Sequence, residues 1–229
     1  MIDFHSHILP GIDDGSKSVC ESIKLLEMLK EQGITKVVAT PHFYANQNPV
    51  SEFMKKRNSA YETLAAEIAD GLPHIILGAE VKYYEGISRL DNLDDLCIGD
   101  SKLLLLEMPM KRWTEYTLRE LSELNSRGSF RIVLAHVERY LSFQPKLLIE
   151  DLTDSGILMQ SNADFFLNLR SRFKAIKMLR NGQINFIGSD CHGVTFRPPH
   201  IGDAYSLIRR KFGDGFVDSM YSNINSYLI

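Results

Sequence analysis

Short runs of aliphatic and β-branched residues recur along the chain, separated by longer segments whose apolar residues repeat every three or four positions. A run of about four to eight such residues is typical of a strand, and the longer segments are typical of helices that cover a sheet. The runs predicted as strands are residues 2–5, 35–40, 74–79, 102–106, 131–135, 157–160 and 184–188. Near-continuous apolar runs such as KLLLLE indicate strands buried in a parallel sheet. The order of the segments predicts an α/β fold built from repeated βα units.

The segment between the first two predicted strands carries signals for both ends of a helix. Ser18 and Glu21 have the spacing of a capping box, and Gly33 follows the segment as a C-cap. The apolar stripe between them consists of Val19, Ile23, Leu26 and Leu29. Glycines expected to turn the chain back towards the sheet precede four later strands, at Gly71, Gly128, Gly156 and Gly182. Seven βα units predict a distorted seven-unit (βα) barrel in a single domain, 1–229, with an open doubly wound sheet as the alternative.

The composition is that of a soluble globular protein, with 44% hydrophobic and 24% charged residues. No signal peptide or membrane-spanning run is evident, and the three cysteines are widely spaced, so we expect a cytoplasmic protein without direct membrane insertion. The formal net charge is −3, and lysine and arginine are spread along the chain rather than clustered. We therefore expect no nucleic-acid partner.

Residue types that bind metals follow six of the seven predicted strands. His5 and His7 are two positions apart, so on an extended strand both side chains point to the same side. The carboxyl ends of parallel strands gather at one face of an α/β fold, which brings these residues together. The candidate ligands are His5, His7, Asp13, Asp14, His42, Glu80, Glu107, His136, Asp190 and His192. His74 begins a strand and His200 lies in a loop, so neither is expected to be a ligand.

The number and type of these side chains predict the chemistry of the site. Five imidazoles and four carboxylates are too many for one ion, and nitrogen and oxygen donors without thiolates suit manganese, iron or zinc. About three divalent ions would leave a surplus of positive charge, which matches a phosphate dianion. Arg139 and Arg197 follow the candidate ligands in the same loops, and guanidinium groups suit phosphate contact. These features predict a phosphatase that uses metal-activated hydroxide.

Several segments resemble the polymerase and histidinol phosphatase (PHP) superfamily: the His-x-His start, TPH, GAE, EMP, AHVERY and SDCHG. The opening HSHILPGIDDG and the late RPP are more closely similar to the bacterial PHP-type tyrosine-protein phosphatases of capsule and exopolysaccharide operons. The resemblance extends from Met1 to about Gly202. It implies a trinuclear site, often active with manganese, and hydrolysis of phosphotyrosine on a partner bacterial tyrosine kinase that regulates polysaccharide synthesis.

The resemblance also implies three ligand sets. The sets are His5, His7, Glu80 and Asp190 for one metal, Glu80, Glu107 and His136 for a second, and Asp14, His42 and His192 for a third. Glu80 would bridge two ions. Asp13 is an alternative to Asp14 as a ligand of the third ion. Some superfamily members have histidine at the position of Glu107, and the glutamate favours the tyrosine phosphatase branch over histidinol phosphatase.

Three alternative functions remain. Cys191 and Arg197 satisfy C-x5-R, the signature of cysteine-based tyrosine phosphatases, although Pro198 disfavours the helix which that motif needs after it. A PHP phosphatase of a small phosphomonoester, such as histidinol phosphate or a sugar phosphate, would use the same metals. A metal-binding regulatory module would keep the ligands without turnover. Aromatic residues that follow strand ends and could flank a phosphotyrosine ring are Phe43, Tyr44, Trp113, Tyr116 and Phe165.

Overall fold

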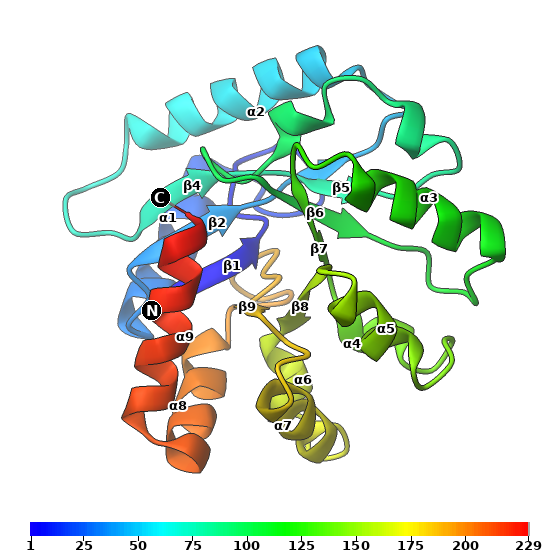
Figure 1. The fold of residues 1–229 in the computed structure, drawn as a ribbon. Helices are drawn as coiled ribbons and strands as arrows, with labels where there is room; N and C mark the ends of the chain where they lie inside the picture. The colour runs from blue at the N-terminus through cyan, green and yellow to red at the C-terminus, as the bar shows by residue number, and fades with distance from the viewer. Residues whose placement is uncertain (229) are drawn as a thin grey trace.

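The computed structural model describes residues 1–228, in which parallel strands are surrounded by helices (Figure 1). The strands are β1 (Ile2–Ser6), β2 (Lys36–Ala39), β3 (His42–Phe43), β4 (His74–Leu77), β5 (Glu80–Lys82), β6 (Leu103–Glu107), β7 (Arg131–Leu134), β8 (Leu158–Asn162) and β9 (Phe186–Gly188). The α-helices are α1 (Val19–Glu31), α2 (Val50–Ala65), α3 (Glu115–Ser126), α4 (Val137–Tyr140), α5 (Leu148–Asp154), α6 (Ala163–Leu167), α7 (Arg172–Arg180), α8 (Ile201–Phe212) and α9 (Asp214–Tyr227). Two 3-10 turns, η1 (Ile87–Arg89) and η2 (Leu93–Leu96), precede β6.

The strands form two parallel sheets, ordered β1-β2-β4 and β3-β5-β6-β7-β8-β9. At the end of β1, Ser6 forms a parallel bridge with Cys191, which lies beyond β9, and the Asp190 N–H donates to the His5 carbonyl at 2.8 Å. These contacts place the first strand beside the last one. The α/β class and the curled parallel arrangement are thereby confirmed.

After two of the predicted runs the extended chain is interrupted and continues as a second short strand, which is why the count of seven units is not confirmed. All seven predicted runs contain a strand, but β3 and β5 are additional short strands that follow β2 and β4. The register is the same on both sides of the interruption, because Lys36 lies opposite His74 and His42 lies opposite Glu80. Pro41 has no N–H group to donate to a neighbouring strand, so the ladder breaks at this level.

Helix α1 begins as the sequence predicts. The Ser18 side chain accepts a hydrogen bond from the Glu21 N–H, and Gly33 has the left-handed φ of 77° expected after a helix end. The Glu21 carboxylate, however, does not return to Ser18; it accepts from the N–H groups of Lys17 and Val194. The hydrogen bond from Val194 to Glu21 therefore links the start of α1 to the loop that follows β9.

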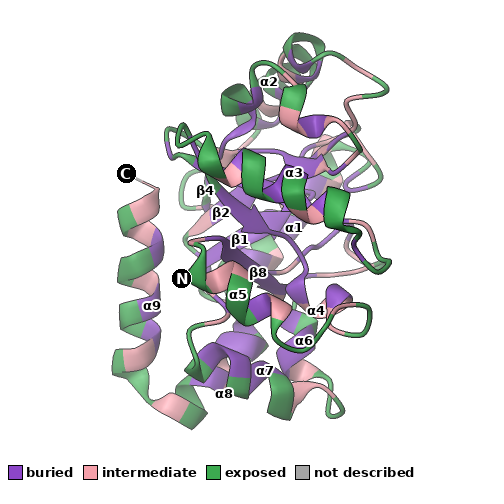
Figure 2. Cartoon of the chain, turned by 45° about the vertical axis from the view of Figure 1, so that its right-hand side comes forward, coloured by how far each residue is buried: buried purple, intermediate pink, exposed green. Residues whose placement is uncertain are grey.

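Buried apolar side chains fill the space enclosed by the strands and the space between the strands and the helices. Phe4 of β1 stacks on Phe186 of β9, with ring centroids 3.9 Å apart, and Ile224 of α9 packs in the same cluster. Figure 2 shows the strands buried and the helices exposed on their outward sides. Among residues 1–228, no helix combines the length and apolar character needed to cross a bilayer.

Candidate metal centre

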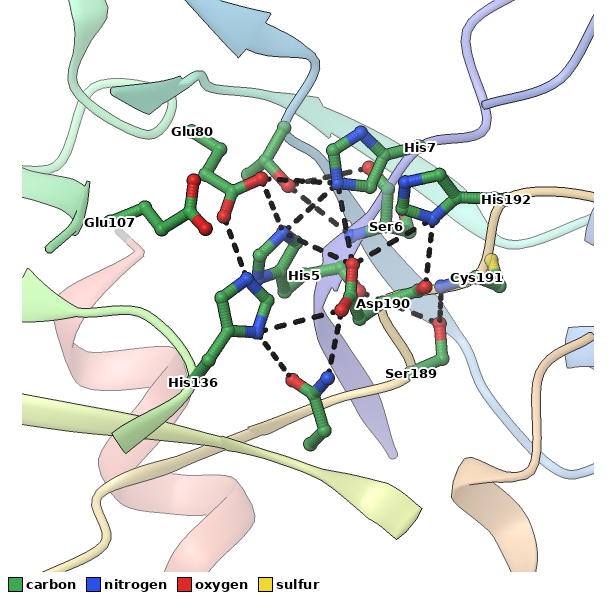
Figure 3. Close-up of polar contacts among 12 residues, drawn as sticks. His5, Ser6, His7, Glu80, Glu107, His136, Ser189, Asp190, Cys191 and His192 are labelled. Carbon is green, nitrogen blue, oxygen red and sulfur yellow. Dashed lines mark hydrogen bonds and ion pairs between the residues drawn. The ribbon is translucent and has the colours of Figure 1, made fainter. Parts of the chain in front are cut away.

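The nine side chains predicted as metal ligands converge at the carboxyl ends of the strands, as Figure 3 shows for seven of them. His5 and His7 point to the same side, with 3.1 Å between their Nε2 atoms, as their spacing predicts. The pairing of β1 with β2 shifts register between Asp3 and Ser6, next to this pair. Gly188 allows β9 to pack closely against His5, because a Cβ at position 188 would lie 2.5 Å from the Cβ of His5. The absence of a side chain at position 188 therefore leaves room for His5 beside β9.

Residues 1–228 contain four overlapping groups of donor atoms, and within each group the atoms lie within 4.8 Å of one another. They are His7, Asp14, His42 and His192; His5, His136 and Asp190; His5, His7 and Glu80; and His42, Glu80 and Glu107. The first group contains the whole third set implied by the resemblance. Glu80 belongs to two groups, as a bridging ligand would. His136 groups with His5 and Asp190 rather than with Glu107, although its Nε2 is 2.7 Å from Glu80.

Unsatisfied buried atoms in the centre show that the residues fit a cation. Within residues 1–228, three buried side-chain nitrogen or oxygen atoms form no hydrogen bond of acceptable geometry, and two of them are His42 Nδ1 and Glu80 Oε2, which lie side by side. These two atoms are 2.9 Å apart, and the Nε2 atoms of His5 and His7 are each 3.3 Å from the same Glu80 oxygen. Buried polar atoms without partners are costly, and a shared cation would satisfy them. The absence of thiolates suits manganese, iron or zinc.

The two consecutive aspartates have different contacts. Asp13 Oδ2 lies 2.8 Å from His7 Nδ1 and accepts from the His42 N–H at 3.0 Å. The Asp14 side chain is 66% exposed, and its Oδ1 lies 3.3 Å from His42 Nε2 and 3.5 Å from His192 Nε2. Asp13 thus orients a histidine from behind, as carboxylates do around metal-ligating imidazoles, whereas Asp14 lies among the donors.

Strand β8 supplies two amide side chains that sequence reasoning missed. Gln160 Oε1 accepts from the His136 N–H at 2.9 Å and lies 3.3 Å from His5 Nδ1. Asn162 Oδ1 lies 2.9 Å from His136 Nδ1, and its Nδ2 donates to Asp190 at 2.8 Å. The only sequence signal was a polar end, QSN, on an otherwise apolar strand. Asn162, which accepts from His136 Nδ1, favours the tautomer whose Nε2 is free to face the centre, whereas Gln160 contacts the His136 backbone and the His5 ring.

Replacing Asn162 with alanine is expected to weaken manganese binding by about 10- to 100-fold, because such outer hydrogen bonds orient the ligands. Titration calorimetry of metal-stripped protein measures the affinity. Asn125→Ala is the matched control, since Asn125 bonds only to the exposed Ser155 carbonyl. Equal manganese affinity in the two variants would contradict the assigned role of Asn162.

Both predicted arginines contact Asp190 at the edge of the centre. Arg139 NH2 is 2.7 Å from Asp190 Oδ2, and Arg197 NH2 contacts the same oxygen. Burial opposes ionisation of Asp190, but hydrogen bonding and charge from the neighbouring histidines hold its pKa well below the usual range. The two arginine side chains remain 31% and 35% exposed, so they are accessible from outside.

Charged neighbours lie close to Glu107 and His192. Lys82, which the sequence did not single out, lies 2.7 Å from Glu107 Oε2. Burial, with the nearby His7 and Arg197, lowers the pKa of His192 to about 4. A neutral imidazole is the form that binds metals.

Three residues of the centre have left-handed backbone conformations. The φ angles are 52° at His136, 53° at Asp190 and 54° at Arg197. Such conformations are unfavourable for residues other than glycine and cluster at functional sites. Here they place side chains from two loops towards one point.

The cysteine-phosphatase alternative does not fit the structure. Cys191 is fully buried, and burial, with nearby Asp3, raises the pKa of its thiol to about 12. The next helix, α8, begins only at Ile201, so no helix N-terminus follows the motif at Arg197. The thiol is therefore neither ionised nor accessible for attack.

Other sequence-derived candidates lie outside the donor groups. His74 and His200 are exposed, at the starts of β4 and α8, and belong to none of the four groups. Three of the five aromatic residues suggested for a substrate ring pack in the core instead: Phe43, Trp113 and Phe165. Tyr44 does lie at the centre, with its ring 5.5 Å from that of His42.

Comparison with known proteins places this site in a family context. The family model for capsular polysaccharide synthesis proteins, CpsB/CapC, matches residues 1–229. Tyrosine-protein phosphatase CpsB of Streptococcus pneumoniae is 30% identical, over 100% of both chains. Tyrosine-protein phosphatase YwqE of Bacillus subtilis is 30% identical, over 93% of this chain and 85% of its own.

The fold is similar to a crystal structure from work on B. subtilis YwqE and S. pneumoniae CpsB, described there as metal-dependent tyrosine phosphatases. The TM-score is 0.82 at 24% identity, over 100% of this chain and 94% of the other. The full-length family match and the 30% identity to curated relatives agree with each other. This chain is a member of the CpsB/CapC family of capsular polysaccharide synthesis proteins.

Proposed function

We propose that this protein is a metal-dependent tyrosine-protein phosphatase. The observation that carries this proposal is the convergence of nine histidine and carboxylate side chains, with two arginines at the edge of the same centre. The relatives at 30% identity are named tyrosine-protein phosphatases, and a structural relative is described as metal-dependent. The reaction is attack of water on phosphorus with cleavage of the bond to the tyrosine oxygen.

The ligands of the proposed trinuclear site are His5, His7, Asp14, His42, Glu80, Glu107, His136, Asp190 and His192. These residues would hold divalent ions, which we propose to be manganese; when bound, the ions would supply positive charge to the phosphoryl oxygens and lower the pKa of water. Arg139 and Arg197 orient the phosphate with their guanidinium groups, and the amides of β8 hold His5, His136 and Asp190 in place.

The substrate in this proposal is a phosphotyrosine-bearing protein, namely a bacterial tyrosine kinase that regulates capsule or exopolysaccharide synthesis. The family description, capsular polysaccharide synthesis, supports this assignment. Tyr44 is partly exposed beside His42, where its ring can flank the substrate ring. The three cysteines form no disulfide, which supports action in the reducing cytoplasm.

We also propose that one domain, 1–229, carries the activity and that its curled sheet is a distorted seven-unit barrel. The constant register of β2–β3 against β4–β5 supports seven runs of extended chain. The bridge from Ser6 to Cys191 supports closure between the first strand and the last.

Steady-state hydrolysis of a phosphotyrosine peptide, compared with histidinol phosphate and a phosphoserine peptide, tests the substrate assignment. We expect kcat/KM to be at least about 100-fold higher for the phosphotyrosine peptide, because binding energy from the ring and peptide contributes only with that substrate. Higher efficiency with histidinol phosphate would instead identify a phosphatase of small phosphomonoesters.

A further inference from the structure

A hollow on the outer surface, between α7 and α8, is separate from the metal centre. Its volume is about 820 Å³, and none of its lining residues is a candidate ligand. The lining residues are Leu169, Arg172, Phe173, Ile176, Lys177, Arg180, Asn181, Leu207, Arg210 and Lys211. In Figure 1, α6 and α7 lie at the lower centre with α8 to their left. We call this surface the α7–α8 groove.

The α7–α8 groove is strongly cationic in a chain whose net charge is −3. Five of its ten lining residues are lysine or arginine, and none is acidic. Within residues 1–228, the four cations Lys177, Arg180, Arg210 and Lys211 form no ion pair and donate no side-chain hydrogen bond. The Arg180 guanidinium lies over the Phe212 ring, 5.5 Å from its centroid, so the charges of Lys177, Arg210 and Lys211 are the ones available to an outside partner.

Apolar side chains complete the groove. Leu169 and Phe173 are 81% and 82% exposed, whereas Ile176 is buried and Leu207 half-buried beneath them. Phe173 precedes Lys177 by four positions on α7, and Leu207 precedes Lys211 by four on α8, so each helix presents an apolar residue beside a cation. Helix C-termini favour cations, which accounts for Lys177, Arg180, Arg210 and Lys211 but not for two exposed apolar side chains.

We propose that the α7–α8 groove docks an acidic amphipathic segment of a partner protein. The apolar face of such a helix would lie over Phe173, Ile176 and Leu207, and its carboxylates would lie near the cations on both sides. The concave form and buried floor favour an inserted segment over the flat surface of a bilayer. Charge complementarity of this kind provides specificity and accelerates association. The inference does not depend on the proposed phosphatase activity.

The test is binding of a fluorescent synthetic peptide of about 18 residues, with leucine on one helical face and glutamate on the other. The triple variant Lys177→Glu, Arg210→Glu, Lys211→Glu is expected to weaken binding at least about tenfold, and Phe173→Ser to weaken it as well. The matched control carries the same charge change at exposed positions elsewhere: Lys55→Glu, Arg119→Glu and Lys146→Glu. We expect the control to bind like the wild type.

Three results would overturn the docking proposal. They are no binding of the peptide, equal weakening by the two triple variants, or equal binding of a peptide with lysine in place of glutamate. Binding to phosphatidylglycerol vesicles without binding to the peptide would identify a membrane surface instead. Hydrolysis of a small aryl phosphate is measured on the same proteins, so failure of the proposed activity is scored separately from failure of docking.

Discussion

Glu80→Ala is expected to lower kcat on a phosphotyrosine peptide by at least about 1000-fold, with loss of bound metal. Glu80 is fully buried, and its Oε1 lies 2.7 Å from His136 Nε2. Its Oε2 lies 2.9 Å from His42 Nδ1 and 3.3 Å from the Nε2 atoms of His5 and His7. Removing this carboxylate leaves four imidazoles without the anion that lies beside all of them. Both metal content and turnover then fall.

The control for Glu80→Ala is Glu120→Gln, which changes another buried glutamate outside the donor groups. Glu120 accepts from the Tyr83 hydroxyl at 2.6 Å and from the Gly86 N–H at 2.8 Å, so it holds a loop rather than a metal. We expect this variant to unfold more easily while it keeps full metal content and turnover per folded molecule. A Glu80→Ala protein that retains metal and activity would exclude the bridging role.

Combined replacement of Arg139 and Arg197 by alanine is expected to lower kcat/KM by at least about 100-fold, because two charged donors to the phosphoryl group are lost. Both guanidinium groups contact Asp190 Oδ2, and both remain partly exposed at the edge of the centre. Lysine at the two positions is expected to restore only part of the activity, since an ammonium group cannot make the bidentate contact.

The arginines could instead act only by holding Asp190, and two further measurements separate these roles. If they bind phosphate, the alanine variant keeps its manganese affinity while inhibition by inorganic phosphate weakens. Reduced manganese affinity with unchanged phosphate inhibition would show a purely supporting role. Arg127→Ala is the matched control, because within residues 1–228 the Arg127 side chain donates to the Ser88 and Leu90 carbonyls and to no group of the metal centre.

The sequence predicts much of this architecture because buried parallel strands have a strong local pattern. The run KLLLLE contains β6, and the ligand His-x-His pair follows from the two-residue period of a strand. Strands β3 and β5 were missed because each has only two or three residues and lies directly after a longer run. Their boundaries depend on pairing between segments far apart in the chain, which no local pattern shows.

Tertiary contacts explain the parts of the site that the sequence did not predict. Gln160 and Asn162 are amides rather than metal ligands, so their contacts with His5 and His136 become evident only when β8 lies beside β7. Lysine and arginine are spread evenly along the sequence. In the folded chain, however, the basic C-terminal turns of α7 and α8 line the same groove. Phe43, for its part, packs against Phe53 rather than facing a substrate.

The most direct test of the metal-centre account is phosphotyrosine-peptide hydrolysis by metal-stripped protein, before and after addition of Mn²⁺, in the wild type, His136→Ala and Cys191→Ser. The account predicts that activity is lost on stripping and returns with manganese in the wild type and Cys191→Ser, but not in His136→Ala. Activity that persists after chelation and disappears in Cys191→Ser would contradict it and would identify the buried thiol as the nucleophile.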